Sequence, residues 1–192
     1  MTQHRSAVPI LAVTIAATLA GIALAGVLAV GDEVPDVTLQ MADGKDAKLS
    51  AHDGRTVVLF FYGTWSKKAG DDAAKVDGLR TGREKQSLDV IGVARDAKVE
   101  DAKKFGDDHK LGFPQAADPK GDLFKRFAEK GLPWVVVIDG KRKLRYTAGG
   151  VAEDDLDAAL TDLLGKREEK KKDDGKKSGK EDDDGKGGGG AK

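Results

Sequence analysis

The chain of 192 residues contains no cysteine. This absence excludes a disulfide framework, a thiolate metal site and a lipid anchor attached to a cysteine. It also removes the side chain that supplies a reactive thiolate at neutral pH. A function that depends on thiol chemistry therefore has no group to carry it, and cysteine usage does not indicate the redox compartment.

The formal net charge of the chain is zero at pH 7, although charged residues are abundant. Lysine and arginine together number 33, aspartate and glutamate together number 33, and charged residues make up 34% of the chain. A balanced surface of this kind is well solvated and does not attract a polyanion. We therefore expect no nucleic-acid partner. Apart from its two unusual ends, the chain is long enough for one domain of ordinary size.

One long apolar run is present, at residues 7–30, which carry no charge and follow Arg5. About 20 apolar residues cross a bilayer, whereas a signal-peptide core has about 7–15, so the length favours an uncleaved anchor over a signal peptide. A charge-free run of this length also argues against a buried helix of a soluble protein. Val27 and Ala29 stand at the two positions that a signal peptidase reads, which favours cleavage. In both cases Arg5 predicts that the chain after Gly31 is extracytoplasmic, in the periplasm or at the cell surface, and either membrane-anchored or secreted.

The opposite end of the chain, residues 166–192, consists almost wholly of Lys, Arg, Asp, Glu and Gly. Such a segment cannot bury enough apolar surface to offset its ordering entropy, so we expect a disordered, solvating tail. The predicted organisation is a signal anchor or signal peptide at residues 1–30, a folded domain at 31–165 and the charged tail at 166–192.

Within the domain, apolar runs that predict strands alternate with helical patterns. Buried strands are predicted at residues 57–62, 88–94 and 135–138, an opening hairpin at 34–50, a short strand or loop at 113–117 and an edge strand near 144–148. Apolar residues at helical spacing predict helices at 67–86, around 99–105, at 121–129 and at 152–163. Three glycines make the first helix short or kinked, and its predicted inner face consists of Ala69, Ala73, Val76 and Leu79. The helix at 121–129 is predicted to pack through Leu123, Phe124, Phe127 and Ala128. This order predicts an α/β fold with a mixed central sheet, parallel in its middle and covered by helices.

The strand at residues 57–62 runs directly into the helix that follows, and such junctions commonly carry the chemistry of α/β proteins. Ser66 lies at the predicted start of the helix, where serine is typical of an N-cap. A nucleophilic serine needs a base, but His52 and His109 are predicted to face solvent away from Ser66, and no third ligand accompanies them for a metal site. We therefore expect neither a hydrolase nor a metal centre.

Four motifs in the same order resemble one known family. Residues 61–69, FYGTWSKKA, are similar to the F-W-A-T-W-C-x-x-C turn of thioredoxin-fold proteins. Residues 31–39 resemble G-x-x-x-P-x-F-x-L, residues 113–121 resemble F-P-x-x-x-D-P-x-G, and residues 131–140 resemble G-x-P-T-x-x-x-I-D-x-x-G. The domain thus resembles the redoxin group, which includes membrane-tethered thiol-disulfide oxidoreductases and AhpC/TSA-type peroxiredoxins. The resemblance implies a thioredoxin-like fold with an N-terminal hairpin over residues 31–165.

The resemblance also implies where the active site would lie and shows that its thiols are gone. Ser66 and Ala69 stand at the positions of the two family cysteines. In the family the first cysteine is a thiolate stabilised by the helix N-terminus, a role that a serine oxygen cannot take because it forms no disulfide. We therefore predict no catalytic residue and no cofactor.

A binding groove is the part of the site that this sequence retains. In the family the proline that matches Pro133 is cis, and the residue before it, here Leu132, presents its backbone to an extended peptide. The chain's two tryptophans, Trp65 and Trp134, fall on either side of this site, and tryptophan is a common binding anchor. The predicted groove therefore consists of Trp65, Ser66, Lys67, Leu132, Pro133 and Trp134.

Simpler interpretations remain open for these groove residues. Trp65 packs against its own loop, and Trp134 begins a core strand. Lys67 and Lys68 either bind an anion together with the free amides of the helix start or are simply solvated.

Three functions follow from these patterns. The first is a redox-inert, extracytoplasmic module that binds a peptide or protein partner. The second is a thiol-disulfide oxidoreductase or peroxiredoxin-type enzyme, as the resemblance implies. The third is a structural component of the cell envelope. The peptide-binding hypothesis requires that Trp65 and Trp134 are at least partly exposed.

Overall fold

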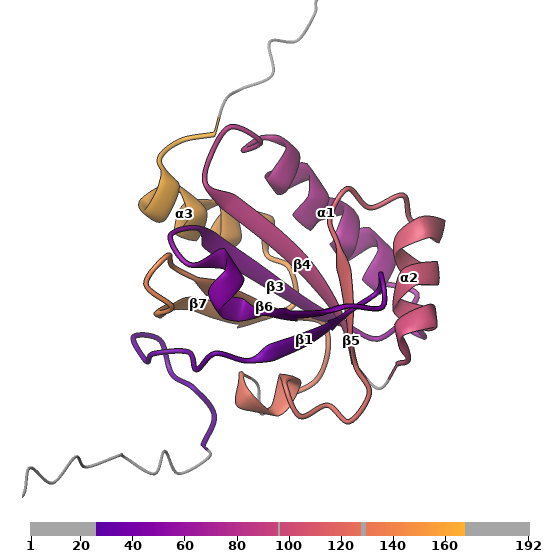
Figure 1. The fold of residues 1–192 in the computed structure, drawn as a ribbon. Helices are drawn as coiled ribbons and strands as arrows, with labels where there is room; N and C mark the ends of the chain where they lie inside the picture. Colours follow the sequence, from indigo (N-terminus) through magenta and orange to yellow (C-terminus); the bar gives the residue numbers. More distant parts are fainter. Residues whose placement is uncertain (1–25, 96, 128–129, 168–192) are drawn as a thin grey trace, which may run out of the picture.

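The computed structural model describes residues 26–95, 97–127 and 130–167. Within them the chain forms seven strands, three α-helices and two short 3-10 helices (Figure 1). The strands are β1 (Thr38–Met41), β2 (Asp46–Lys48), β3 (Thr56–Tyr62), β4 (Leu88–Arg95), β5 (Gln115–Asp118), β6 (Trp134–Ile138) and β7 (Leu144–Gly149). The helices are η1 (Leu49–His52), α1 (Ala69–Thr81), α2 (Val99–Asp108), η2 (Phe124–Arg126) and α3 (Glu153–Leu164).

All seven strands belong to one sheet, in the order β2-β1-β5-β4-β3-β6-β7. The centre is parallel, because β4 pairs in parallel with both β3 and β5. The two edges are antiparallel: β1 pairs with β2 and β5, and β6 pairs with β3 and β7. This arrangement confirms the predicted mixed sheet and its opening hairpin.

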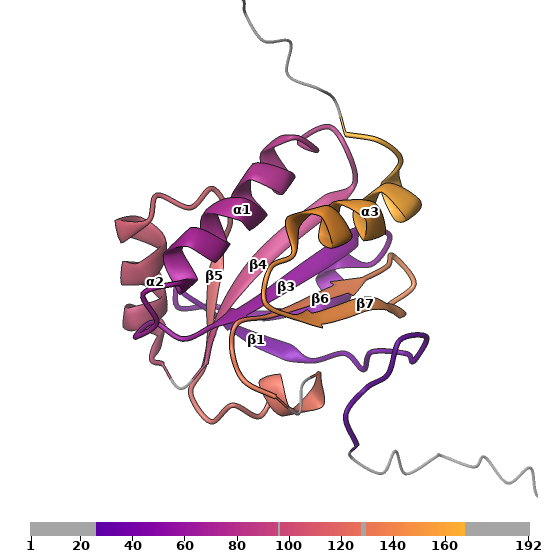
Figure 2. The same ribbon diagram turned by 180° about the vertical axis from the view of Figure 1, so that it is seen from behind.

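Both faces of the sheet are covered, which explains why the central strands are almost wholly apolar. The three α-helices lie on one face and contribute to a helix-side core (Figure 2). The N-terminal segment, η1 and η2 cover the other face and form a second core, which includes Leu39, Leu49, Phe61 and Phe124. Every residue of β3 is buried as a result.

The structure confirms one predicted helix in a shortened form and contradicts another. The helix predicted at residues 67–86 is the short α1, and its predicted inner face of Ala69, Ala73, Val76 and Leu79 is buried. The helix predicted at residues 121–129 is wrong, because among its described residues, 121–127, only the three of η2 are helical.

A local side-chain contact explains this second difference. The carboxylate of Asp118, at the end of β5, accepts hydrogen bonds from the amides of Leu123 and Phe124 at 3.3 and 2.8 Å. It thereby holds the segment in a loop with a single 3-10 turn. The predicted contact of Ala128 lies outside the described residues.

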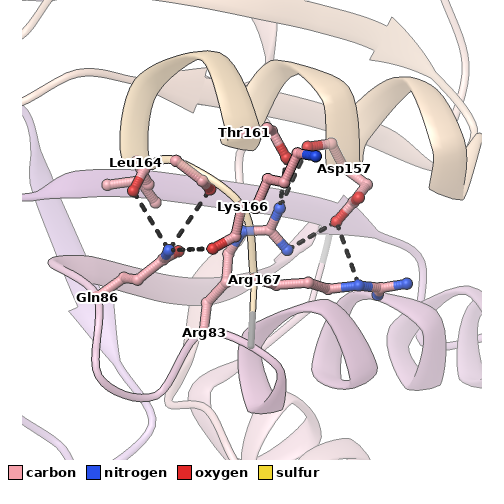
Figure 3. A network of polar contacts seen from close by, with 8 residues as sticks. Arg83, Gln86, Asp157, Thr161, Leu164, Lys166 and Arg167 are labelled. Carbon is pink, nitrogen blue, oxygen red and sulfur yellow. Dashed lines mark hydrogen bonds and ion pairs between the residues drawn. The ribbon is translucent and has the colours of Figure 1, made fainter. Parts of the chain in front are cut away.

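A buried arginine joins α1 to α3 (Figure 3). Arg83, just after α1, donates to the carbonyl of Asp157 at 3.2 Å and to the hydroxyl of Thr161 at 3.0 Å, and its Nη1 lies 2.7 Å from Oδ1 of Asp157. Gln86 donates to the carbonyls of Leu164 and Lys166 at 3.2 and 3.0 Å. The two Gln86 bonds satisfy the free carbonyl of Leu164 at the end of α3 and that of Lys166 just beyond it, and they fix where the chain leaves the domain.

The two ends of the chain fall mainly outside the described part. The predicted apolar segment before Gly26 and the charged tail beyond Arg167 belong to the residues that are not described. Among residues 26–95, 97–127 and 130–167, no helix combines the length and apolar character needed to cross a bilayer.

His52 is not the solvent-facing residue that the sequence predicted. Its side chain is half-buried at the end of η1, and its Nδ1 lies 2.7 Å from Oδ2 of Asp89 on β4. Arg55 donates to the same oxygen at 2.8 Å. Burial by itself would raise the pKa of Asp89, but the hydrogen bonds from Arg55 and His52 and the positive charge of Arg55 hold it below its ordinary value of 3.8.

The lowered pKa of Asp89 predicts a stability change at acidic pH. A carboxyl whose pKa is lower in the folded state stabilises that state above its unfolded pKa, and this contribution is lost as the pH falls through the folded pKa. We expect Asp89→Asn to reduce the free energy of unfolding at about pH 7 and to make its decline toward pH 3 shallower. Urea titrations at a series of pH values measure this. Asp46→Asn, at an exposed site on β2, is the control, and an equally steep decline in Asp89→Asn would contradict the assignment.

Candidate functional site

The first wall of the site is the tight turn between β3 and α1. The amide of Ser66 donates to the carbonyl of Gly63, and the amide of Ala69 donates to the carbonyl of Ser66, each at 3.0 Å. The Trp65 ring covers Gly63 so closely that a Cβ on that glycine would lie 2.7 Å from the ring. Glycine is therefore required where the turn passes beneath the indole.

The two family cysteine positions face different surroundings. Ser66 is half-buried, whereas Ala69 is buried in the helix-side core. The N-cap predicted for Ser66 is wrong, because α1 begins at Ala69 and its N-cap residue, Lys68, makes no side-chain capping bond. Lys67 and Lys68 are both exposed, and Nζ of Lys68 lies 3.9 Å from a carboxylate oxygen of Asp72.

The second wall is the segment that leads into β6. The peptide bond between Leu132 and Pro133 is cis, as the resemblance implied. The Pro133 carbonyl accepts a hydrogen bond from the amide of Gly150 at 2.8 Å, whereas no described residue hydrogen-bonds to the backbone of Leu132. Trp134 pairs with Phe61 of β3. This register places the second wall beside the end of the strand that delivers the first.

The two tryptophans differ in exposure. Trp65 exposes 63% of its surface. Trp134 is half-buried, donates from Nε1 to Oγ1 of Thr147 at 2.6 Å, and lies over Gly149, where a Cβ would come within 3.1 Å of the ring. Both therefore keep exposed surface, as the peptide-binding hypothesis requires. The simpler interpretations describe their packing as well, since Trp65 rests on its own turn and Trp134 begins β6.

A buried polar pair supports the first wall from below. The hydroxyl of Tyr62, the last residue of β3, donates to Oε1 of Gln115 at 2.7 Å. Gln115 in turn donates to the carbonyl of Phe113 at 2.9 Å. Gly92 and Gly106 make room for this glutamine, because a Cβ at either would lie within 2.7 Å of its side chain. Burial raises the pKa of Tyr62 well above its ordinary value of 10.0, so the hydroxyl stays protonated and donates.

His109 lies closer to the turn than the sequence predicted. It is exposed, but its ring stacks on Phe105 at 4.4 Å between centroids and touches Gly70 in the first turn of α1. Phe105 stacks in turn on Tyr62 at 4.2 Å. The structure shows no hydrogen bond between His109 and Ser66, so the ring packs beside the site without activating the serine.

Asp72 on α1 is a buried acid that was not among the predicted site residues. Its side chain is fully buried; Oδ1 lies 3.2 Å from Nζ of Lys75, and Oδ2 has no hydrogen-bond partner. Its spacing from Val76 and Leu79 was a signal that it shares their buried side of the helix. No group of three or more potential metal ligands lies together among the residues that the structure describes.

Comparison with known proteins assigns this fold and site to a family. The AhpC/TSA family model matches residues 30–147, which is more than half of the chain. The chain belongs to the AhpC/TSA family. A curated relative, the thiol-disulfide oxidoreductase ResA of Geobacillus thermodenitrificans, is 25% identical over 137 residues, which cover 71% of this chain and 79% of the relative.

Solved structures agree with the assignment. A protein described as the thiol:disulfide interchange protein DsbE of Chlorobium tepidum superimposes with a TM-score of 0.65 and 27% identity, covering 71% of this chain and 98% of that one. The peroxidoxin BcpB of Mycobacterium tuberculosis gives a TM-score of 0.61 at 24% identity, over 70% and 95% of the two chains, and shows the fold alone. The chain thus has the thioredoxin-like fold of thiol-disulfide oxidoreductases, without a cysteine.

The Tyr62–Gln115 bond predicts a stability effect beneath the site. Tyr62→Phe leaves the buried amide oxygen of Gln115 without its donor, and an unsatisfied buried acceptor costs about 1–3 kcal/mol. We expect a loss of this size in the free energy of unfolding, measured by urea titration.

Tyr146→Phe is the matched control for this change. Tyr146 is half-buried on β7, and no described residue hydrogen-bonds to its hydroxyl. Its variant should therefore lose much less stability, and equal losses in the two variants would contradict the role of the buried pair.

Proposed function

We propose that this protein is a redox-inert thioredoxin-fold module that binds an extended segment of a protein partner outside the cytoplasm. In this proposal residues 7–30 either anchor it in the membrane or direct its secretion. The observation that carries the proposal is that the two segments of the family site are present without a thiol: Ser66 and Ala69 stand at the cysteine positions, Trp65 is exposed, and the Leu132–Pro133 bond is cis.

The backbone of the second wall supports a peptide ligand. The Leu132 amide and carbonyl are not used by any described residue, so a strand laid alongside can pair with them in the manner of an added β-strand. Gly150 occupies the Pro133 carbonyl and thereby limits such pairing to the residue before the proline. Main-chain pairing of this kind accepts many sequences, and side-chain contacts then select among them.

The exposed indole supplies the side-chain contact. A tryptophan at the centre of an interface commonly contributes a large share of the binding energy, because its broad ring excludes water from the contact. Trp65 is already held against Gly63, so little side-chain freedom is lost on binding. Lys67 and Lys68 line the same turn and place positive charge at the rim.

Family relatives favour an enzyme as the second candidate. The names of ResA and DsbE state thiol-disulfide chemistry for those proteins. Such chemistry needs two thiols that exchange a disulfide, and the serine hydroxyl at residue 66 cannot enter that cycle. A structural role in the envelope is the third candidate, and it requires no occupied groove.

The first test asks whether the groove binds. A peptide is selected from a displayed library against the purified protein, and its affinity is measured by calorimetry. We expect Trp65→Ala to weaken binding by at least about tenfold, equivalent to about 1.4 kcal/mol, and to leave the thermal unfolding midpoint unchanged. Val30→Ala removes an exposed apolar side chain on the N-terminal segment and should bind normally. Full affinity in both Trp65→Ala and Trp134→Phe would instead support the structural role.

The second test asks whether thiols at residues 66 and 69 are sufficient to give the protein disulfide-reductase activity. Ser66→Cys/Ala69→Cys restores the family spacing across the turn in which the Ala69 amide donates to the Ser66 carbonyl. We expect the natural protein to be silent in insulin reduction and peroxide consumption, and the double variant to reduce insulin. Ser66→Cys alone is the control, since one thiol cannot complete the cycle. Turnover by the natural protein would overturn the proposal.

A further inference from the structure

The start of the described chain, residues 26–34, packs onto one end of the fold, and we call it the N-terminal strap. The amides of Leu28, Gly31 and Val34 donate to the carbonyls of Arg126, Leu144 and Arg142 at 2.8, 2.7 and 2.7 Å respectively. Leu28 packs against the second core, and Val34 is fully buried. The apolar run of residues 7–30 therefore continues into the folded domain without a polar linker.

Apolar side chains on the strap face outward. Among the described residues, the exposed large hydrophobic side chains are Val27, Val30 and Trp65, and the two valines are 38% and 60% exposed. Trp65 belongs to the groove, whereas both valines adjoin the segment predicted to lie in the membrane. Exposed apolar residues in this position suit the boundary between headgroups and acyl chains.

Exposed cations surround the same end of the molecule. The strap bonds to η2 and to the turn between β6 and β7, which carry Arg126, Lys141 and Lys143, all exposed. None of these three cations forms an ion pair with another described residue.

Two other cations at this end of the molecule form ion pairs with aspartates. Arg142 lies 3.4 Å from Asp53, and Arg145 lies 3.5 Å from Asp139. Of the two acids on the strap, Asp32 accepts the amide of Ala29 at 2.8 Å, and Glu33 lies opposite Lys143 in a single antiparallel bridge. Neither contact neutralises a carboxylate, so Arg126, Lys141 and Lys143 stand beside two acidic side chains, Asp32 and Glu33, and positive charge remains in excess among these five residues.

We propose that the strap, the β6–β7 turn and η2 form a bilayer-facing surface. In it Val27 and Val30 reach the boundary of the acyl region, while Arg126, Lys141 and Lys143 contact lipid phosphates. The proposal rests on the membrane tether in the proposed function. The attraction of each cation to an anionic surface is modest, but a tether without a linker makes the contact intramolecular and the effective lipid concentration high.

This orientation turns the binding groove away from the membrane. Ile138 pairs with Leu144 at the strap end of the β6–β7 ladder, and Trp134 pairs with Gly149 at the groove end. Four residues of strand separate Ile138 from Trp134, which is about 13 Å at 3.3 Å per residue. The groove therefore opens away from the bilayer, where an extended partner can reach it.

The absence of cysteine allows a direct test with the full chain. Lys141→Cys gives a single labelling site on the proposed surface, and Lys104→Cys gives a matched exposed site on α2, at the opposite side of the fold from the strap (Figures 1 and 2). Each fluorophore-labelled protein is reconstituted into vesicles of phosphatidylcholine and phosphatidylglycerol that carry a headgroup-attached quencher. We expect the label at residue 141 to lose most of its fluorescence and the label at residue 104 to lose little.

Charge variants then test the contact itself. Arg126→Gln/Lys143→Gln should lower the quenching at residue 141 toward the level at residue 104, whereas Lys103→Gln/Lys110→Gln should leave it unchanged. Equal quenching at residues 141 and 104 would overturn the proposal. It would also be overturned if the label at residue 141 lost fluorescence in vesicles without quencher and this loss increased with protein density, because a second copy of the protein would then cover the surface.

Flotation separates this inference from the function on which it rests. A chain that does not float with the vesicles has no membrane tether, and both the tether and this surface are then rejected. A chain that floats but shows equal quenching at the two positions keeps the tether and loses only this inference. Neither outcome tests peptide binding, which is measured in a separate experiment.

Discussion

Burial of β3 on both faces is the constraint on which the rest of the structure depends. All seven of its residues are buried, with β4 paired in parallel on one side and β6 antiparallel on the other. The parallel neighbour requires a helical crossover, which supplies α1 and the turn before it. The antiparallel neighbour begins beside the end of β3 and so brings cis-Pro133 next to that turn. The positions of the two segments that would form the proposed groove are therefore consequences of how one apolar strand is covered.

Loss of the cysteines changes the chemistry of this site more than its architecture. The walls are fixed by backbone hydrogen bonds, by the Tyr62–Gln115 pair and by glycines that admit the neighbouring side chains. None of these contacts uses the side chains at residues 66 and 69. These supports hold the backbone of the site in place without its reactive groups, and a site without thiols cannot carry out disulfide exchange.

Local patterns in the sequence predicted most of the fold. The inner face of α1 followed from helical spacing, and the buried strands followed from apolar runs, because burial of one periodic face is a local property of a segment. The four family-like motifs then ordered these segments into a thioredoxin-like sheet. The groove residues were named from the same motifs, although their separate walls, 66 residues apart at Ser66 and Leu132, meet only through the pairing of β3 with β6.

Features that the sequence did not predict depend on side-chain partners that apolar periodicity does not reveal. Asp118 turns a predicted helix into the short η2 by accepting two amides. His52 is drawn to Asp89 across 37 positions, and His109 reaches Gly70 because α2 packs beside α1. In each case a polar side chain had several plausible partners, and only the tertiary arrangement selects one. Periodicity reports which side of a segment is covered, but it does not report what covers it.

The β6–β7 ladder connects the two surfaces on which the proposals rest. One end of it holds the N-terminal strap through Leu144, and the other end carries Trp134 and the carbonyl of Pro133, which Gly150 binds. β6 and β7 are paired strands of the same sheet and are stiff in comparison with a loop. In the proposed arrangement, strand length and not a flexible linker sets the distance from the tether to the groove. A partner bound at Trp65 would then be held at a fixed height above the proposed bilayer-facing surface.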